Sequence, residues 1–390
     1  MEMEFFRNKK TAIVLSGGVI KAGAWHLGVA LALEELGFVF KSNNTQGEHQ
    51  LEIGTYVGSS AGSFINAYLA SGVRPHQVVD SFLKKSSTSK PRPISYKDLF
   101  TIKRPSIGKS IWSKLDPLSD SPLLLKTFMA PMLKIGGLFS TEGLVKYLKR
   151  EVLLSNSYDD YAADLFTVAT HLDHSRKLIF GKYKYPNPRH DVTSVYKTGY
   201  PIAETVGASM SVPFIYTPYP LKSPDTDIIK YYIDGEIRET LSTHIATDNG
   251  CENIISSWTH TPYHYQEEIG SLVNYGLPII CIQAIHLMIE KKIIDSRSRK
   301  KTARDVISSL DMVLKENKIP DQKRKKIVEL MERKLNYNPK VNFIDIFPKH
   351  EDYKIFFKNY FSLDPEKAKI IVTAGYNRTM EVIQKFSGNE

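Results

Sequence analysis

A serine inside a Gly-x-Ser-x-Gly pentapeptide, between a strand pattern and a helix pattern, constrains this chain more than any other feature. The pentapeptide is residues 58–62 (GSSAG), with Ser60 at its centre. Residues 51–57 alternate apolar with polar or small side chains, and residues 64–69 carry apolar side chains at helical spacing before Gly72. We therefore predict a sharp strand-to-helix turn that holds Ser60 in a strained conformation and exposes its hydroxyl beyond the sheet. The first amides of the new helix lack internal partners, so they face any negative charge that forms there.

A second strand–glycine–helix unit precedes this one. Residues 11–15 (TAIVL) are typical of a buried strand, and residues 16–18 (SGG) lead into an apolar helix pattern over about residues 21–36, closed by Gly37. Two such units in succession predict a βαβα arrangement and hence a mainly parallel sheet. Their patterns predict further strands at residues 165–170, 177–180 and 228–233, and a helix at 144–153 behind the cap residues 140–142.

The rest of the chain divides at about residue 260. Before it, residues 86–122 are rich in Ser, Lys and Pro and are expected to form an inserted loop, followed by the apolar segment 123–138. After it, we expect a strand at 279–285, amphipathic helices to about Leu335, a strand or turn at 370–373 and a helix at 380–386. We predict a core of residues 10–260 and a mostly helical region, 261–390, packed on it.

Composition indicates a globular protein made in a reducing compartment. The 390 residues are 42% hydrophobic and 24% charged, and no apolar run approaches the roughly 18 residues that span a bilayer. The first ten residues lack the apolar stretch of a signal peptide, and Cys251 and Cys281 have no metal-ligand spacing. We expect a cytoplasmic location or a peripheral one at a membrane; export by a signal-less system stays open.

The formal charge of +10 favours acidic partners. The basic residues concentrate between Lys291 and Arg304 and in the run 323–326. These runs are interpreted either as a solvated helix face or as a site of attraction to an anionic membrane surface. Nucleic-acid binding is not expected, because no recognition module accompanies the charge.

Gly17 and Gly18 lie between the first strand and its helix, where their amides can face an anion. Residues 17–23 (GGVIKAG) match neither phosphate-loop spacing, so an oxyanion formed when Ser60 attacks an ester is the better interpretation than a phosphate. A tight turn without a ligand is the alternative. Lys21, in the first helical turn, either serves anion binding or is a surface lysine.

A serine nucleophile needs a base. Asp234 and Gly235 follow a β-rich run, so Asp234 is a candidate; a simple Asp-Gly turn is the alternative. The chain order Ser, acid, His also leaves four histidines open as the base: His244, His260, His264 and His286.

Four motifs together resemble those of the patatin-like phospholipases, in the same order and at similar spacing. They are residues 15–21 (LSGGVIK), 58–62 (GSSAG), 207–214 (GASMSVPF) and Asp234-Gly235; residues 138–144 (LFSTEGL) also resemble a segment of bacterial members. The resemblance covers roughly residues 10–240. It implies a patatin-like three-layer α/β/α fold with a mainly parallel central sheet, here with a C-terminal helical extension.

The resemblance also implies a serine lipid acyl hydrolase, of the phospholipase A or lysophospholipase type, that uses a Ser-Asp dyad without histidine, metal or cofactor. By position, Ser60 would be the nucleophile and Asp234 its base. The amides of Gly17, Gly18 and Val19 would form the oxyanion loop, and Lys21 stands where the family has Arg or Lys. The substrate would be a phospholipid or lysophospholipid, and the apolar segment 123–138 would line an acyl groove or belong to the core.

Three residues depart from the family pattern. Val19 replaces the third loop glycine, Ala22 replaces the glycine after the basic residue, and Glu236 follows Asp-Gly where a small residue is usual. A left-handed Val19 would strain the loop, and Glu236 would raise the pKa of the base. Low basal activity or a need for an activator is therefore a hypothesis. Acyl transfer to an acceptor other than water, or a weakly active or inactive lipid-binding or interaction module, are the alternatives, although the retained Ser60 and Asp234 favour an enzyme.

Overall fold

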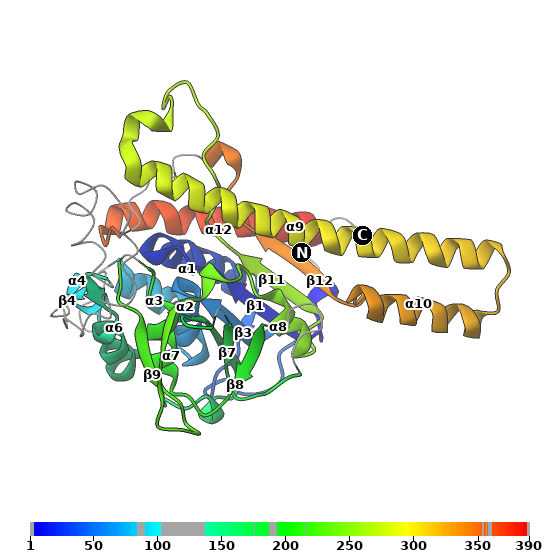
Figure 1. The fold of residues 1–390 in the computed structure, drawn as a ribbon, viewed down its shortest axis with the longest axis horizontal. Coiled ribbons are helices and arrows are strands. Elements are labelled where there is room, and N and C mark those ends of the chain that lie inside the picture. The colour runs from blue at the N-terminus through cyan, green and yellow to red at the C-terminus, as the bar shows by residue number, and fades with distance from the viewer. Residues whose placement is uncertain are drawn as a thin grey trace, which may run out of the picture.

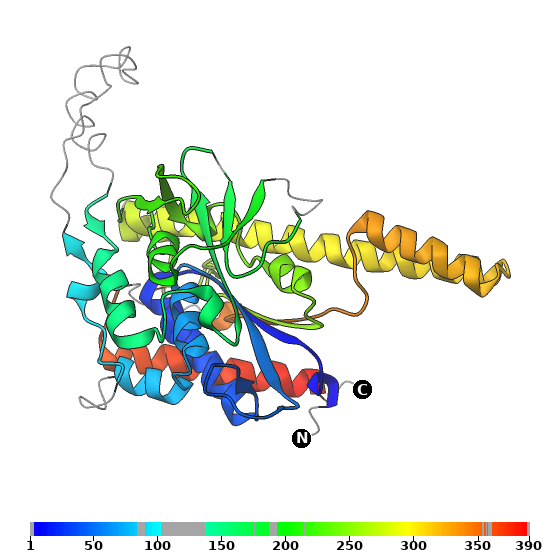
Figure 2. The ribbon, with the colours of Figure 1, turned by 90° about the horizontal axis from the view of Figure 1, so that it is seen from below.

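A mixed, mostly parallel β-sheet between helical layers forms the body of the molecule (Figures 1 and 2). The computed structural model describes residues 4–83, 90–102, 137–174, 176–186, 193–213, 215–352, 355, 357 and 361–387. Within these residues the main sheet has the strand order β12-β11-β1-β3-β6-β10-β9. The strands on this path are β1 (Thr11–Leu15), β3 (Glu52–Ser59), β6 (Asp164–His171), β9 (Tyr219–Lys222), β10 (Ile229–Asp234), β11 (Asn253–Ser257) and β12 (Asn342–Ile346).

The central strands β12, β11, β1, β3 and β6 run parallel, and β10 and β9 extend the sheet in antiparallel fashion. Three further strands join it beside this path: β2 (Val39–Phe40) along β3, β7 (Lys177–Phe180) along β6, and β8 (Ser194–Lys197) along β7. A small second sheet pairs β4 (Thr101–Ile102) with β5 (Phe139–Ser140). Because β1, β3 and β6 are parallel neighbours, the loops that follow them meet at one edge of the sheet.

Helices cover both faces of the sheet. Figure 2 shows α1 (Val19–Glu35) and α12 (Pro365–Ser387) on one side and α9 (Gly276–Glu316) on the other. The remaining helices are α2 (Ala61–Ala70), α3 (Pro75–Phe82), α4 (Tyr96–Leu99), α6 (Glu142–Tyr147), α7 (Ile202–Ser209), α8 (Thr243–Asp248) and α10 (Asp321–Leu335). Among the described helices, none is both long enough and apolar enough to cross a bilayer.

The contact between α1 and α12 depends on two glycines. A Cβ at Gly28 would lie 2.0 Å from the Val372 carbonyl oxygen, and one at Gly375 would lie 2.4 Å from the Trp25 carbonyl oxygen. The two backbones therefore approach each other more closely than any side chain allows. The contact ties the C-terminal helix to the helix that follows the first strand.

The predicted α/β architecture with a mainly parallel sheet and a C-terminal helical region is confirmed. The strands at 11–15 and 177–180 have the predicted bounds, and the helix predicted from residue 21 begins two residues earlier, at Val19. The strand predicted at 279–285 is wrong, because these residues lie within α9. Helical spacing continues past the run through Ile289 and Ile293, which pack against Trp258.

The strand or turn predicted at 370–373 is also wrong, because these residues lie within α12, where Ala368, Ile371 and Val372 are buried at helical spacing. Most of the predicted loop 86–122 and nearly all of the apolar segment 123–138 lie outside the described residues. Strand β12, far beyond residue 260, pairs with β11. The division into a core of residues 10–260 and a helical region of 261–390 stays a prediction.

Candidate active site

Ser60 lies at the turn between β3 and α2, with φ 50° and ψ −124°. This left-handed conformation is strained for a residue with a side chain. The two glycines of the pentapeptide make the turn possible. A Cβ at Gly58 would lie 2.5 Å from the Ser63 backbone, and one at Gly62 would lie 2.1 Å from the Leu15 carbonyl oxygen. The first glycine therefore lets α2 fold back over β3, and the second lets α2 begin directly against β1.

Asp234 is the last residue of β10 and is 4% exposed. Its amide donates to the Ser211 carbonyl oxygen at 3.0 Å, and its Oδ1 accepts the Glu236 amide at 2.9 Å. Burial raises the pKa of Asp234 to about 6, and hydrogen bonds from the Ser60 hydroxyl and the Glu236 amide partly offset that rise. The Asp234 carboxyl is thus next to the Ser60 hydroxyl, as the sequence predicts.

The loop of Gly17, Gly18 and Val19 lies beside Ser60. A Cβ at Gly17 would be 2.9 Å from the Ser60 Cβ, so a side chain there would displace the serine. Gly18 has φ 127° and Val19 has φ 57°. Val19 therefore has a left-handed conformation, the condition under which the sequence implies a strained loop, and a β-branched residue disfavours it.

Glu236 occupies the loop from the other side. The Gly17 amide donates a hydrogen bond to Glu236 Oε1 at 2.9 Å, although the two residues are far apart in sequence. Glu236 is 7% exposed, and burial, followed by the charge of Asp234, raises its pKa to about 8. The amide predicted to stabilise an oxyanion is thus bound to a carboxyl group of the chain itself.

Lys21 is buried, so its interpretation as a surface lysine is wrong. Its side chain is 1% exposed, and its Nζ donates to the Ile355 carbonyl oxygen at 3.5 Å. Burial lowers the pKa of Lys21 to about 7. Nearby, His26 bridges the loop and the sheet, with Nε2 2.9 Å from the Ser16 carbonyl oxygen and Nδ1 3.1 Å from Ser257 Oγ.

Of the four candidate histidines, His260 borders the loop at residues 17–19. His244 is 3.3 Å from Lys177 Nζ and 3.6 Å from a Glu239 oxygen, and His264 is exposed. The His260 and His286 rings pack edge-to-face with their centroids 5.2 Å apart, and His286 Nδ1 is 3.0 Å from the Thr261 carbonyl oxygen. The Gly18 side of the loop faces His260: a Cβ on Gly18 would be 3.6 Å from the ring. The ionisable side chain that hydrogen-bonds the Ser60 hydroxyl is Asp234.

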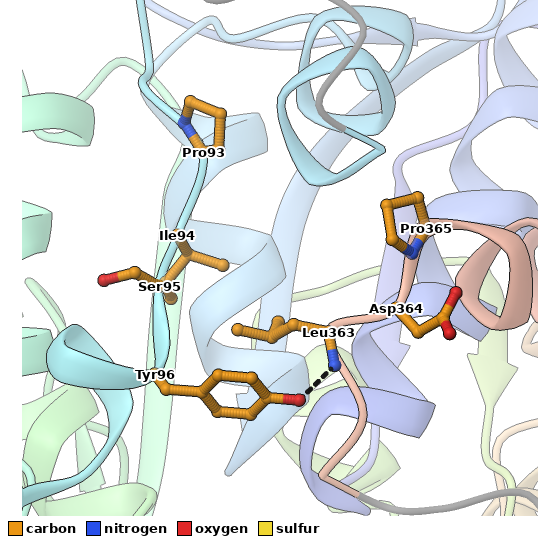
Figure 3. Close-up of a pocket in the computed structure, with 7 residues that line it drawn as sticks. All are labelled: Pro93, Ile94, Ser95, Tyr96, Leu363, Asp364 and Pro365. Atoms are coloured by element: carbon orange, nitrogen blue, oxygen red, sulfur yellow. Dashed lines mark hydrogen bonds between the residues drawn. The ribbon is translucent and has the colours of Figure 1, made fainter.

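A pocket of about 530 Å³ lies between the segment before α4 and the start of α12 (Figure 3). Its lining is Pro93, Ile94, Ser95, Tyr96, Leu363, Asp364 and Pro365. The Tyr96 hydroxyl accepts the Leu363 amide across it at 2.9 Å, which joins the two segments. None of the predicted site residues lines this pocket.

Comparison with known proteins agrees with this geometry. A family model described as patatin-like phospholipase matches residues 13–247, more than half of the chain. The chain therefore belongs to the patatin-like phospholipase family, a family of lipid acyl hydrolases. A search of curated proteins found no match. The matched span contains Ser60, Asp234 and the loop at residues 17–19, whereas α9, α10, β12 and α12 lie beyond it.

Two contacts of the site were not predicted from the sequence. Ser209 accepts the Ser60 amide at 2.8 Å, and Glu236 accepts the Gly17 amide. Ser209 belongs to the motif at 207–214, which marked the segment without a role for this residue. Glu236 was singled out as a departure from the family pattern, but its effect was expected on Asp234 and not on the loop.

Proposed function

We propose that this chain is a serine lipid acyl hydrolase of the phospholipase A or lysophospholipase type, with Ser60 as nucleophile and Asp234 as base. The observation that carries the proposal is the buried Asp234 carboxyl beside a serine at a strained strand-to-helix turn. A carboxyl group with a pKa of about 6 is roughly nine-tenths ionised at pH 7. It is therefore a stronger base than an exposed aspartate, and at pH 7 most of it is still ionised and able to accept a proton.

The reaction follows from these positions. Ser60 Oγ attacks the acyl carbonyl carbon while Asp234 takes the hydroxyl proton, and the carbonyl electron pair becomes an oxyanion. The tetrahedral intermediate collapses to an acyl-serine, and the alcohol leaves with the proton that Asp234 held. Water then attacks the acyl-serine with Asp234 again as base, which releases the fatty acid and regenerates Ser60. No metal or cofactor is needed for any of these steps.

The loop at Gly17, Gly18 and Val19, together with the N-terminus of α2, is the proposed oxyanion site. Backbone amides of this kind are typically worth about 3–4 kcal/mol per donor in the transition state. The Gly17 amide can contribute only when Glu236 releases it, because the two are hydrogen-bonded. This contact favours a lipid acyl hydrolase with low basal activity.

Two other outcomes use the same site. If an alcohol replaces water in the second half of the reaction, the protein is an acyltransferase. If the Gly17 amide is never released, the protein is a lipid-binding or interaction module of this fold. The retained pairing of Ser60 with Asp234 favours hydrolysis over the inactive module.

Hydrolysis of p-nitrophenyl butyrate and of a fluorogenic phospholipid tests the proposal. Ser60→Ala and Asp234→Asn are each expected to reduce kcat/KM by about a thousandfold or more, because each removes a partner in proton transfer and attack. His260→Ala serves as the comparison for a histidine base. Activity that survives Asp234→Asn but disappears with His260→Ala would replace the dyad by a Ser-His mechanism, and product analysis with added glycerol would reveal acyl transfer.

A further inference from the structure

The contact between Glu236 and Gly17 lies where the substrate oxygen has to bind, if the proposed function holds. Glu236 Oε1 is 2.9 Å from the Gly17 amide nitrogen, a distance typical of a charge-assisted or carbonyl-type hydrogen bond. The same peptide segment borders Ser60: the position of a Gly17 Cβ is 2.7 Å from Glu236 Cγ and 2.9 Å from Ser60 Cβ. Glu236 and Ser60 therefore contact Gly17 together.

We infer that Glu236 is an intramolecular inhibitor of the oxyanion loop, which holds the Gly17 amide until its side chain moves away. The inference rests on the proposed function, because it takes Gly17 as an oxyanion donor. A carboxyl group resembles both the ester carbonyl and the fatty acid product, since each presents an sp² oxygen to a backbone amide. An ester carbonyl oxygen and the Glu236 oxygen compete for the same N–H.

The position of Glu236 in the chain explains how it reaches the loop and how it can leave. It is the middle residue of a single 3-10 turn, Gly235–Ile237, directly after Asp234. Gly235 and Glu236 are buried, whereas Ile237 is 51% exposed and Arg238, which follows the turn, is exposed, so the turn ends at the surface. A rotation of the Glu236 side chain would free Gly17 without moving the sheet that holds Ser60 and Asp234.

Activity measurements on Glu236 variants test this inference. Glu236→Ala removes the oxygen from Gly17, so kcat/KM for p-nitrophenyl butyrate is expected to rise about tenfold or more. Glu236→Gln keeps an oxygen that can accept the Gly17 amide, and it replaces a carboxyl group that is mostly neutral at pH 7 because its pKa is raised to about 8, so its gain is expected to be well below that of the alanine variant. Arg238→Ala, at the residue directly after the turn, is the matched control and is expected to leave the rate unchanged.

Two results would overturn the inference: an alanine variant no faster than the wild type, or a glutamine variant that gains as much as the alanine variant. The second result would mean that occupation of the Gly17 amide by a side-chain oxygen does not limit the rate. Amide hydrogen exchange at Gly17 gives a readout that needs no turnover, and it is expected to accelerate in Glu236→Ala. If Ser60→Ala leaves the activity intact, the proposed function fails, while the exchange result still reports on the Glu236 contact.

A separate observation concerns the helical hairpin, defined here as the distal part of α9 from Arg297, the connection at 317–320 and α10. Its first residues contact the body of the protein, where Arg297 pairs with Asp345 of β12 and Lys300 donates to Thr243 of α8. Figures 1 and 2 show the remainder projecting well beyond the sheet and its covering helices. Residues 297–335 contain 13 Lys and Arg against 6 Asp and Glu, so most of the net charge of the chain lies here. Within α10, all of whose residues the structure describes, no side chain is buried.

Apolar side chains interleave with these charges. The exposed ones are Val306, Met312, Val313, Ile327, Leu330 and Leu335. Helix α9 packs against α10, which covers some apolar surface between them. A purely nucleic-acid-binding arm has little use for the large apolar side chains that stay exposed. A basic helix surface with interleaved apolar side chains is what an anionic lipid surface binds, through charge attraction and shallow insertion.

The structure assigns the hairpin as a docking surface for an anionic lipid bilayer. A second copy of the chain is disfavoured as the occupant, because two such basic surfaces would repel each other. This assignment does not depend on the catalytic chemistry, although it would bring the proposed site to its substrate.

Co-sedimentation with vesicles tests the docking surface in a Ser60→Ala background, so turnover does not affect the result. The protein is expected to bind phosphatidylcholine vesicles that contain about 30% phosphatidylglycerol, and to bind pure phosphatidylcholine vesicles far more weakly. Changing the exposed Lys323, Lys325 and Lys326 to Gln is expected to weaken binding about tenfold. The control changes three exposed lysines outside the hairpin, Lys146, Lys184 and Lys369, to Gln.

Equal losses in the two triple variants would overturn the assignment, since the hairpin would then have no special role. Binding to an RNA oligonucleotide or an acidic protein without binding to anionic vesicles would overturn it as well. Circular dichroism of the hairpin variant separates loss of binding from loss of helix. If the hairpin variant loses vesicle binding but, with Ser60 present, still hydrolyses a soluble ester, the docking proposal is tested separately from the proposed hydrolase activity.

Discussion

The backbone amide of Ser60 donates a hydrogen bond to Ser209 Oγ at 2.8 Å, and Ser209 Oγ donates in turn to the Val168 carbonyl oxygen at 2.6 Å. All three residues are buried. One hydroxyl at the end of α7 therefore fixes the strained turn to β6. The serine that carries the candidate chemistry is held by a second serine 149 residues further along the chain.

Removing this hydroxyl is expected to affect both stability and rate. Ser209→Ala leaves the buried Ser60 amide without its partner, which costs about 1–3 kcal/mol in the free energy of unfolding. It also frees the turn, so kcat is expected to fall about tenfold or more. Urea denaturation and ester hydrolysis measure the two effects.

Ser211→Ala is the matched control for this variant. The Ser211 hydroxyl donates to the Gly207 carbonyl oxygen at 2.9 Å, and that oxygen also accepts Thr141 Oγ1 at 2.9 Å. Its loss leaves no acceptor unpaired, so the unfolding free energy is expected to change by less than about 1 kcal/mol. Equal effects of the two substitutions would contradict a specific role for Ser209.

The buried Asp234 predicts how the rate depends on pH. Below its pKa of about 6 the carboxyl is protonated and cannot accept the Ser60 proton. The value of kcat/KM is therefore expected to rise with pH, to pass its midpoint near pH 6 and then to level off. A profile that is flat between pH 5 and 8 on a soluble ester would contradict Asp234 as the base.

The same shift has a consequence for stability. The folded-state pKa of about 6 exceeds the ordinary 3.8, so the native state binds the proton more tightly than the unfolded state does. Stability from this group therefore falls as the pH rises between these two values and stays lower above them. A pKa difference of about two between the folded and unfolded states corresponds to about 3 kcal/mol in the free energy of unfolding. The unfolding free energy of Asp234→Asn is expected to exceed that of the wild type at pH 7 and to approach it near pH 4; equal stabilities at pH 7 would contradict a buried, ionised Asp234.

Local patterns in the sequence account for the parts of the site that were predicted. Strand β1, the turn at Ser60 and the end of β10 each follow from a short run of residues and the glycine beside it. The prediction of a strand at 279–285 is wrong because a short run with six apolar residues out of seven fits a buried strand and a buried helix equally well. The residues after this run decide in favour of the helix, because Ile289 and Ile293 continue at helical spacing and pack against Trp258.

The contacts that modify the site join residues far apart in sequence, so no local pattern contains them. Glu236 reaches Gly17 across 219 residues, and Lys21 is covered by a backbone carbonyl 334 residues away, at Ile355. A lysine in the first turn of a helix looks like a surface residue until the C-terminal segment is placed over it. The sequence offers a left-handed Val19 only as a hypothesis, because valine stands where the resembling family has glycine, and the structure has φ 57° there.

That conformation gives a test of the loop. Val19 has φ 57°, which costs a β-branched residue about 1–2 kcal/mol relative to glycine. Val19→Gly removes this strain, but glycine gains entropy in the unfolded chain, so the unfolding free energy is expected to change by less than about 1 kcal/mol. The rate is the informative readout: a relaxed loop is expected to raise kcat several-fold.

Ala22→Gly, at the other altered glycine position, is the control for Val19→Gly. Ala22 lies inside α1, where a glycine costs about 1 kcal/mol and relieves no strain. It is therefore expected to destabilise the protein without raising the rate. No gain with Val19→Gly would count against a loop defect and leave Glu236 as the explanation for low activity.

The contact between α1 and α12 predicts the largest effect of a single methyl group. At Gly28 a Cβ would be 2.0 Å from the Val372 carbonyl oxygen and 2.8 Å from the Tyr376 amide nitrogen, and both are backbone atoms that cannot rotate away. Gly28→Ala therefore has to separate the two helices, at a cost of about 3 kcal/mol in the free energy of unfolding.

At Gly23, on the same helix, the nearest atom to a Cβ is Ile65 Cδ1 at 3.9 Å. Gly23→Ala is expected to stabilise the protein by about 0.5–1 kcal/mol through helix propensity alone. Urea denaturation of the two variants compares them directly, and a Gly28→Ala protein as stable as Gly23→Ala would mean that α12 does not pack against α1 in solution.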